Sequence, residues 1–181
     1  LLAGVVSRPV RTVAVTAIRR TRRAPLRLAY VAYPLFGGVT LVVEAVQAGQ
    51  LSMFAAVSLC VYVVWAAGAL FSLNLPGDHG SALPSVLTAT VSGQAVVTGT
   101  VVASVLFALP FALVVPPVAG LASPLGPVET GLLTVGTVVG VVASPMLATG
   151  VGTRFPRFGT VRITSNREAV MPGKLAFVVY S

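Results

Sequence analysis

The chain has 181 residues, of which 56% are hydrophobic and only 9% are charged. Soluble domains carry about 25% charged residues, so this composition excludes an ordinary soluble fold. The formal net charge of +8 would suit a nucleic-acid partner, but no recognition motif or aromatic platform accompanies the basic residues, and we predict no such partner.

The basic residues, 12 in all, fall into two blocks separated by apolar sequence. The first block is Arg8, Arg11, Arg19, Arg20, Arg22, Arg23 and Arg27, and the second is Arg154, Arg157, Arg162, Arg167 and Lys174. Membrane proteins keep loops rich in Lys and Arg on the cytoplasmic side. An even number of crossings between the blocks would place both there. We therefore predict a multi-pass protein of the cell membrane with both ends of the chain in the cytoplasm.

Residues 1–27 are predicted to form a basic cytoplasmic amphipathic segment. Ser7 can cap a helix, and Pro9 is tolerated in the first turn. Apolar residues such as Val10 and Val13 recur at helical spacing before the Arg-rich run of residues 19–23. A helix of this kind lies on anionic lipid headgroups, but simple anchoring by positive charge explains the pattern without a ligand, and we favour that interpretation.

Four apolar stretches are long enough to cross a bilayer, which takes about 20 helical residues. Residues 28–148 therefore form an all-α membrane domain with predicted spans at about 28–46, 51–73, 95–115 and 128–148. Glu44 and Glu129 fall at the outer ends of spans, where a carboxylate reaches water, so we interpret them as boundary markers rather than ion-relay residues. Pro34, Pro110 and Pro145 lie inside spans and should bend them.

Small residues predict where the spans pack. Gly99 and Ala103 in the third span, like Gly136 and Gly140 in the fourth, are four positions apart, a spacing that allows helix backbones to approach closely. We predict that these two spans pack through those residues, with a transport pathway as the less favoured interpretation. Cys60 lies in an apolar run and is expected to behave as a small hydrophobic residue.

The inner connection 74–93 is too long for a simple turn. After a break at Pro76-Gly77-Asp78, Ser81 can cap a helix over residues 81–93 that stops at Gly93. One face of this helix would be apolar. The residues on that face are Leu83, Val86, Leu87 and Val91. The helix either docks a protein or only re-enters the membrane interface, and periodicity does not separate the two.

The rest of the chain contains few residues that could catalyse a reaction or bind a metal. Its four carboxylates and one His supply only the adjacent pair Asp78 and His79, for which a turn is a better interpretation than a metal site, so we predict no catalytic residues, metal or cofactor. Residues 149–174 are predicted to be a basic cytoplasmic loop, and 175–181 to begin a further apolar span. The chain begins without Met, so we expect an internal piece of a larger membrane protein.

Several stretches together resemble a known family. They are Leu73–Gly80 with the following Leu83–Thr88 and Gly93, the small-residue span, and Gly150–Phe158, which ends in Phe-Pro-Arg-Phe. Their order is similar to that in the large permease subunits of type-2 ATP-binding-cassette exporters, especially those of halophilic archaea.

This resemblance implies a transport subunit that is not itself an enzyme. A separate cytoplasmic ATP-binding subunit would hydrolyse ATP and dock on the inner helix, and the permease would act as a homo- or heterodimer in the lipid bilayer. The docking candidates are Ser81, Leu83, Val86, Leu87 and Val91. The alternatives are a structural or interaction membrane protein and, less favoured, an ion-coupled carrier, which would need ionisable residues near mid-span.

Overall fold

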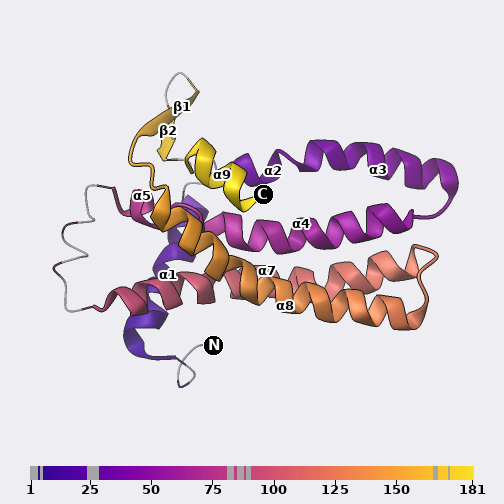
Figure 1. The fold of residues 1–181 in the computed structure, drawn as a ribbon, viewed down its shortest axis with the longest axis horizontal. Helices are drawn as coiled ribbons and strands as arrows, with labels where there is room; N and C mark the ends of the chain where they lie inside the picture. Colours follow the sequence, from indigo (N-terminus) through magenta and orange to yellow (C-terminus); the bar gives the residue numbers. More distant parts are fainter. Residues whose placement is uncertain are drawn as a thin grey trace.

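The fold is described from a computed structural model (Figure 1), which describes residues 4, 6–23, 29–80, 84, 88, 91–164, 167–170 and 172–181. The helices in chain order are α1 (Arg8–Arg23), α2 (Ala29–Ala32), α3 (Leu35–Ala48), α4 (Met53–Ser72), α5 (Leu75–His79), α7 (Gly93–Leu121), α8 (Pro127–Arg154) and α9 (Lys174–Tyr180). The strands β1 (Thr160–Thr164) and β2 (Arg167–Val170) form an antiparallel hairpin that pairs Thr160 with Val170.

Helices α4, α7 and α8 pack together along the long axis of the molecule (Figure 1). Their contact is built from small side chains, because Ala67 of α4, Ala108 and Ala112 of α7, and Val141 of α8 form a buried cluster. Lipid supplies little hydrophobic drive between helices, so close van der Waals packing of small residues is what holds such a bundle together.

The four predicted spans correspond to four helical stretches that are long and apolar enough to cross a membrane. These stretches are Tyr30–Ala48, Met53–Ser72, Gly93–Leu121 and Pro127–Arg154. The third runs beyond its predicted end because Pro116 and Pro117, taken as part of a connection, lie inside α7. Proline has a helical φ and loses only its own N–H bond, so it need not end an apolar helix. The fourth continues past the predicted residue 148 to Arg154.

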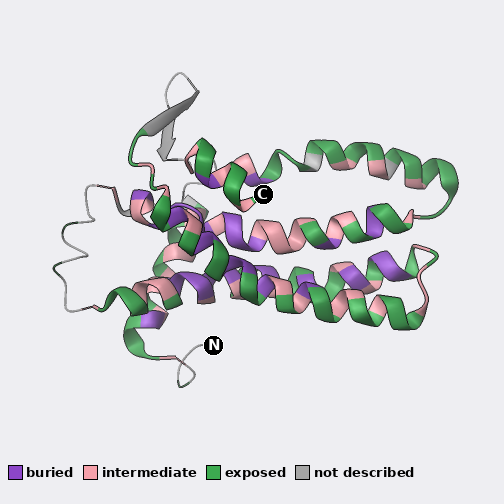
Figure 2. Ribbon diagram, viewed as in Figure 1, coloured by how far each residue is buried: buried purple, intermediate pink, exposed green. Residues whose placement is uncertain are grey.

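The first span is interrupted at Pro34, as predicted, with α2 ending at Ala32 and α3 beginning at Leu35. The Tyr62 hydroxyl donates to the carbonyl of Val31 at 2.8 Å and fastens α2 to α4. In contrast, α3 is largely exposed (Figure 2). Only 6% of Tyr30–Ala48 is buried, against 44% of α4. Its apolar side chains would contact acyl chains if the helix lies in a bilayer.

The connections α3–α4 and α7–α8 meet at one end of the bundle, which we call the turn end (Figure 1). The backbone N–H of Leu51 donates to the carbonyl of Ala122 at 2.7 Å and joins the two connections. Gly49, with φ of 70°, ends α3 in the left-handed conformation that suits glycine. Glu44 in α3 and Glu129 in the first turn of α8 are both exposed near this end, where predicted.

The opposite end, which we call the basic end, carries α1, α5, the hairpin and α9 (Figure 1). The region 149–174, predicted as a loop, therefore contains the last turn of α8 and the β1–β2 hairpin. Residues 160–164 are too few for period-2 alternation to indicate a strand, which is why no strand was predicted there.

Candidate functional site

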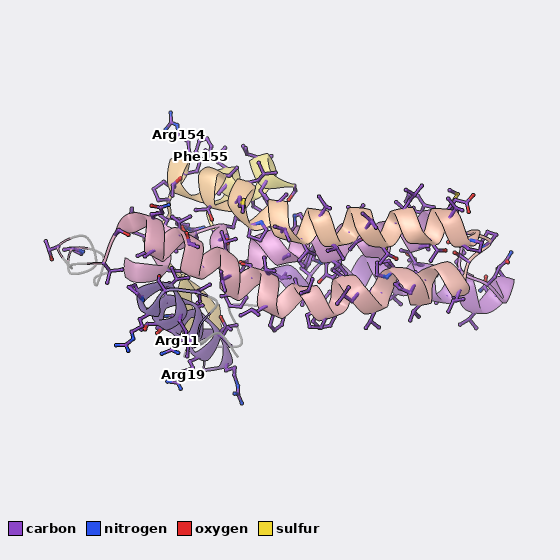
Figure 3. The ribbon with its side chains drawn as sticks, turned by 90° about the horizontal axis from the view of Figure 1, so that it is seen from below. Arg11, Arg19, Arg154 and Phe155 are labelled. Carbon is purple, nitrogen blue, oxygen red and sulfur yellow. The ribbon has the colours of Figure 1, made fainter. Side chains whose placement is uncertain are left out.

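Arginine residues gather at the basic end of the bundle (Figure 3). Arg11 and Arg19 extend from α1 on one side, and Arg154 projects from the end of α8 on another. The Arg154 guanidinium carbon lies 5.7 Å from the centre of the Phe155 ring, a cation–π distance. The described residues of both charge blocks thus lie at one end of the molecule.

Helix α1 packs against α7, so its apolar face is covered by protein. Val10 and Ala14 are buried, and a Cβ at Gly99 of α7 would lie 2.6 Å from Cβ of Val13. The prediction that this face lies on lipid headgroups is therefore wrong for these three positions. The spacing alone predicted an apolar face, and it could not show that the face is covered by a helix of the same chain.

Helix α5 occupies the position predicted as a chain break. Pro76 stands in the first turn, where an N–H has no intrahelical acceptor, so it begins a helical turn instead of preventing one. Leu75 is 8% exposed. Asp78 belongs to α5, and no cluster of three His, Cys, Asp or Glu side chains occurs among the described residues.

Asn74, between α4 and α5, makes the most specific polar contact at this end. Its Nδ2 donates to the carbonyl of Arg157 at 3.0 Å, and the N–H of Arg157 donates to its Oδ1 at 3.0 Å. The side-chain amide thus pairs with both backbone groups of one residue beyond α8, as a neighbouring strand would. Asn74 is 4% exposed, so water has little access to this pair, which we call the Asn74 clamp.

Two glycines allow the chain segments around the clamp to approach. A Cβ at Gly152 of α8 would overlap the carbonyl oxygen of Leu73, and a Cβ at Gly77 of α5 would overlap the carbonyl oxygen of Arg157. Leu73 is fully buried in a cluster with Ala148 and Ala176. The stretches 73–80 and 150–158, on which the family resemblance rests, therefore pack directly against each other.

Most of the predicted docking helix lies outside the described residues. This holds for Ser81, Leu83, Val86 and Leu87. Pro84 and Thr88 are helical, and the Thr88 hydroxyl donates to the carbonyl of Pro84 at 3.0 Å.

The predicted stop of this helix is wrong. Val91 lies in a bend, and Gly93 is the first residue of α7. The hydroxyl oxygen of Ser92 accepts from the N–H of Ala95 at 3.2 Å. A serine cap before a glycine starts the next helix here, because the cap satisfies an N–H that the first turn leaves unpaired.

Three of the four predicted packing residues do not face the helix expected. A Cβ at Gly140 of α8 would lie 2.7 Å from Val64 of α4, whereas at Gly136 it would meet no atom within 4 Å. Ala103 is fully buried in α7, and Gly99 faces α1. The predicted joint packing of the third and fourth spans is therefore wrong for Gly99, Gly136 and Gly140. At the turn end, α7 and α8 approach through Gly120 instead, where a Cβ would overlap Thr130.

Sequence reasoning missed the Asn74 clamp. Asn74 and Arg157 both lie in stretches that carry the family resemblance, but no contact between them was predicted from the sequence. A buried Asn directly after an apolar span was the available signal, since a buried amide needs hydrogen-bond partners. Nothing in the sequence identified the backbone of Arg157 as that partner. Cys60, by contrast, is buried in α4 as predicted.

In comparisons with models of protein families, with curated proteins and with solved structures, nothing matched this chain. The class of protein is therefore inferred from the fold alone. Four helices long and apolar enough to cross a bilayer indicate a multi-pass helical membrane protein.

Proposed function

We propose that the chain is the membrane-spanning permease subunit of an ATP-binding-cassette exporter, energised by a separate ATPase that binds at the basic end. On this proposal the basic end is cytoplasmic, because an excess of Arg and Lys is retained on that side. The observation that carries the proposal is the Asn74 clamp. It connects residues 80–93, which follow α5 and which we call the inner segment, to the core of the bundle.

The clamp supports a coupling role because of where it stands in the chain. The inner segment begins after α5, and α5 follows α4 with only Leu73 and Asn74 between them. Two hydrogen bonds from Asn74 to Arg157 then tie this junction to the end of α8. A displacement of the inner segment would therefore be passed to α4 through the chain and to α8 through the clamp.

The alternative is a structural or interaction protein in which the same contacts only hold the inner segment in place. An ion-coupled carrier fits less well, because Glu44 and Glu129 lie near the turn end and not at mid-span. The two leading proposals differ in one requirement, since only a permease of this class needs an ATPase partner.

The experiment purifies the tagged full-length protein, as wild type and as Leu87→Asp, from native membranes. We expect an ATP-binding-cassette ATPase to co-purify with the wild type and to be lost, together with ATP hydrolysis in the complex, from the variant. A charge on the predicted apolar face should disrupt a protein contact because an unpaired carboxylate is costly to bury.

Thr88→Asp is the matched control, because it introduces the same charge at a described, exposed position on the polar side. It should retain the ATPase. Loss of the ATPase from both variants would mean that an added negative charge disrupts ATPase binding whichever face of the helix carries it. An inserted wild-type protein that retains no ATPase would overturn the permease proposal and favour the structural alternative.

A further inference from the structure

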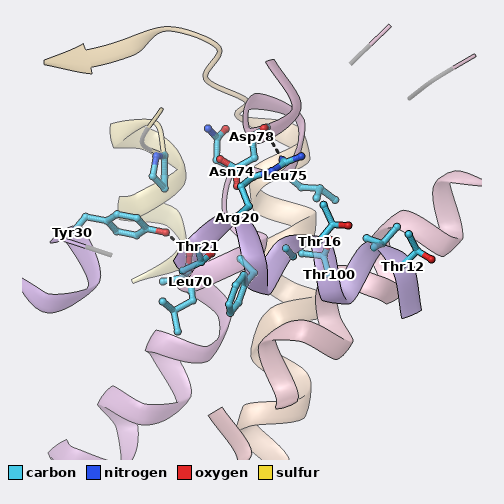
Figure 4. Close-up of a pocket in the computed structure, with 15 residues that line it drawn as sticks. Thr12, Thr16, Arg20, Thr21, Tyr30, Leu70, Asn74, Leu75, Asp78 and Thr100 are labelled. Carbon is cyan, nitrogen blue, oxygen red and sulfur yellow. Dashed lines mark hydrogen bonds between the residues drawn. The ribbon is translucent and has the colours of Figure 1, made fainter. Parts of the chain in front are cut away.

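A polar cavity lies at the basic end between α1, α4, α5 and α7 (Figure 4). Its volume is about 250 Å³. Thr12, Thr16 and Arg20 line it from α1 at intervals of four residues, so they form one stripe along that helix. Asn74 and Thr100 line it from the bundle side. The hydroxyls of Thr12 and Thr100 donate to the carbonyls of Arg8 and Val96 in their own helices. The Arg20 guanidinium and the Thr16 hydroxyl are therefore the donors in this cavity that suit a phosphate.

The charge around the cavity favours an anion. Helix α1 contains six arginines and no acidic residue in the sequence RPVRTVAVTAIRRTRR. Asp78 is the acidic residue of the lining, and Arg20 donates to its backbone carbonyl at 3.0 Å. Figure 4 shows this bond at one edge of the cavity. One carboxylate beside an Arg-rich helix leaves the local field positive.

A second, apolar cavity adjoins the first at Leu70. Its volume is about 270 Å³, and Leu70 lines both cavities. Its walls come from α2, α4 and α7, with Tyr62 and Ala66 on one side and Phe107 and Phe111 on another. The hydroxyls of Tyr30 and Tyr62 donate to Ala69 and Val31, so the α2 wall is held against α4.

The two cavities together match the dimensions of one lipid leaflet. From Thr100 to Phe111, α7 rises roughly 16 Å at about 1.5 Å per residue. Half the hydrocarbon core of a bilayer is about 15 Å thick. The polar cavity lies at the end of α4 near residues 69–71, where lipid headgroups would be. The apolar cavity lies along residues 62–70 of the same helix.

We infer that this pair of cavities binds an anionic phospholipid from the leaflet at the basic end. The phosphate lies between Arg20 and the Thr16 hydroxyl, and one acyl chain lies along Leu70, Phe107 and Phe111. Charge complementarity selects the anionic headgroup, and the length of the apolar cavity selects a long chain. The site is independent of the proposed transport function, because it requires no ATPase.

The headgroup test measures phosphatidylglycerol bound to the delipidated full-length protein in neutral detergent, by native mass spectrometry during a lipid titration. Arg20→Gln should weaken binding about tenfold, the loss expected for one charge-assisted hydrogen bond. Arg20→Lys should restore most of it, because the positive charge remains. Arg8→Gln removes the same charge from an exposed position of α1 outside the cavity, and it should change binding less than about twofold.

The chain test uses Ala66→Trp, which fills the apolar cavity with an apolar side chain. It should weaken binding of dioleoyl phosphatidylglycerol about tenfold and leave the dihexanoyl lipid unaffected, because only the long chain enters that cavity. Val139→Trp, at a position 61% exposed on α8, is the control and should have no effect.

Equal losses with Arg20→Gln and Arg8→Gln would mean that binding is general attraction to a basic surface, and the site would be wrong. Unchanged binding of the long-chain lipid to Ala66→Trp would overturn the acyl-chain position. Phosphatidylcholine binding as tight as phosphatidylglycerol would overturn the anionic selectivity.

Discussion

Replacing Asn74 by Leu should release the segment after α8 from the α4–α5 junction. Leu has a similar size but neither donates nor accepts, so both hydrogen bonds of the Asn74 clamp are lost. The carbonyl and N–H of Arg157 then lose their partner. The change is therefore a test of the polar contact, with little change of volume.

The expected loss of stability follows from the polar groups that lose their hydrogen-bond partners. A buried polar group without a partner costs about 1–3 kcal/mol, which gives about 2–6 kcal/mol for the two backbone groups of Arg157. Arg157 is only partly buried, so water will recover some of that cost. We expect a net loss of about 1–3 kcal/mol in the local stability of the contact. This corresponds to an increase of about 5- to 150-fold in the equilibrium constant for local opening.

Hydrogen exchange in a peptide covering residues 155–158 measures this opening directly. Pro156 has no N–H, and the N–H of Phe155 donates to Val151 within the end of α8. The Arg157 N–H is thus the group that Asn74 protects. Asn74→Leu should remove its protection.

Ser72→Ala is the matched control for this exchange measurement. It is a buried substitution that removes the contact between Ser72 and Ser104, whose hydroxyl oxygens are 3.3 Å apart, without touching Arg157. It should leave exchange at residue 157 unchanged. If Asn74→Leu leaves that exchange unchanged as well, the clamp contributes nothing to the stability of this end, and the coupling argument built on it fails.

Three further predictions concern orientation and packing. On a Cys60→Ser background, Cys at Ala48 or Ser123 should react with an impermeant thiol reagent from outside intact cells, and Cys at Ser81 or Ser165 should not; the reverse pattern would show that the basic end is extracellular. Gly140→Leu should lower the unfolding temperature in detergent through a loss of about 1–3 kcal/mol against Val64, whereas Gly136→Leu should have little effect, and equal effects would contradict the assigned partners. Gly152→Ala should destabilise the basic end because its Cβ meets the backbone of Leu73, whereas Gly150→Ala, which meets nothing within 4 Å, should be tolerated; a variant Gly152→Ala with unchanged protease sensitivity at residues 150–158 would refute this contact.

The four spans were predictable because hydropathy depends on composition over a long window and not on the partner of each residue. Met53–Ser72 differs from the predicted span 51–73 by only one or two residues at each end. Errors arose where proline or glycine was taken as an end signal. Pro116 and Pro117 continue α7, and Gly93 begins it. These residues mark helix ends in water, where an unpaired carbonyl is solvated, more reliably than in apolar surroundings.

The candidate site was less predictable because its contacts are far apart in the sequence. The motifs around Asn74 and Gly152 were noticed for their composition, but the pairing of Asn74 with Arg157 joins residues on either side of two spans. The spacing of Gly140 indicated a close approach and not which helix approaches. A single sequence contains no information on which of three neighbouring helices a small residue faces, so the predicted partner was wrong while the small residue itself was significant.

Helix α4 connects the parts of the basic end to the bundle. Its carbonyls at Trp65 and Ala69 accept from the hydroxyls of Tyr180 and Tyr30, and its end is continuous with Asn74. A carbonyl has two lone pairs, so these bonds add α9 and α2 to α4 without breaking its own helical ladder. With the Asn74 clamp included, α2, α9 and the end of α8 are all fastened to one helix. On the proposed transport function, a movement that begins at the inner segment would reach them together through α4.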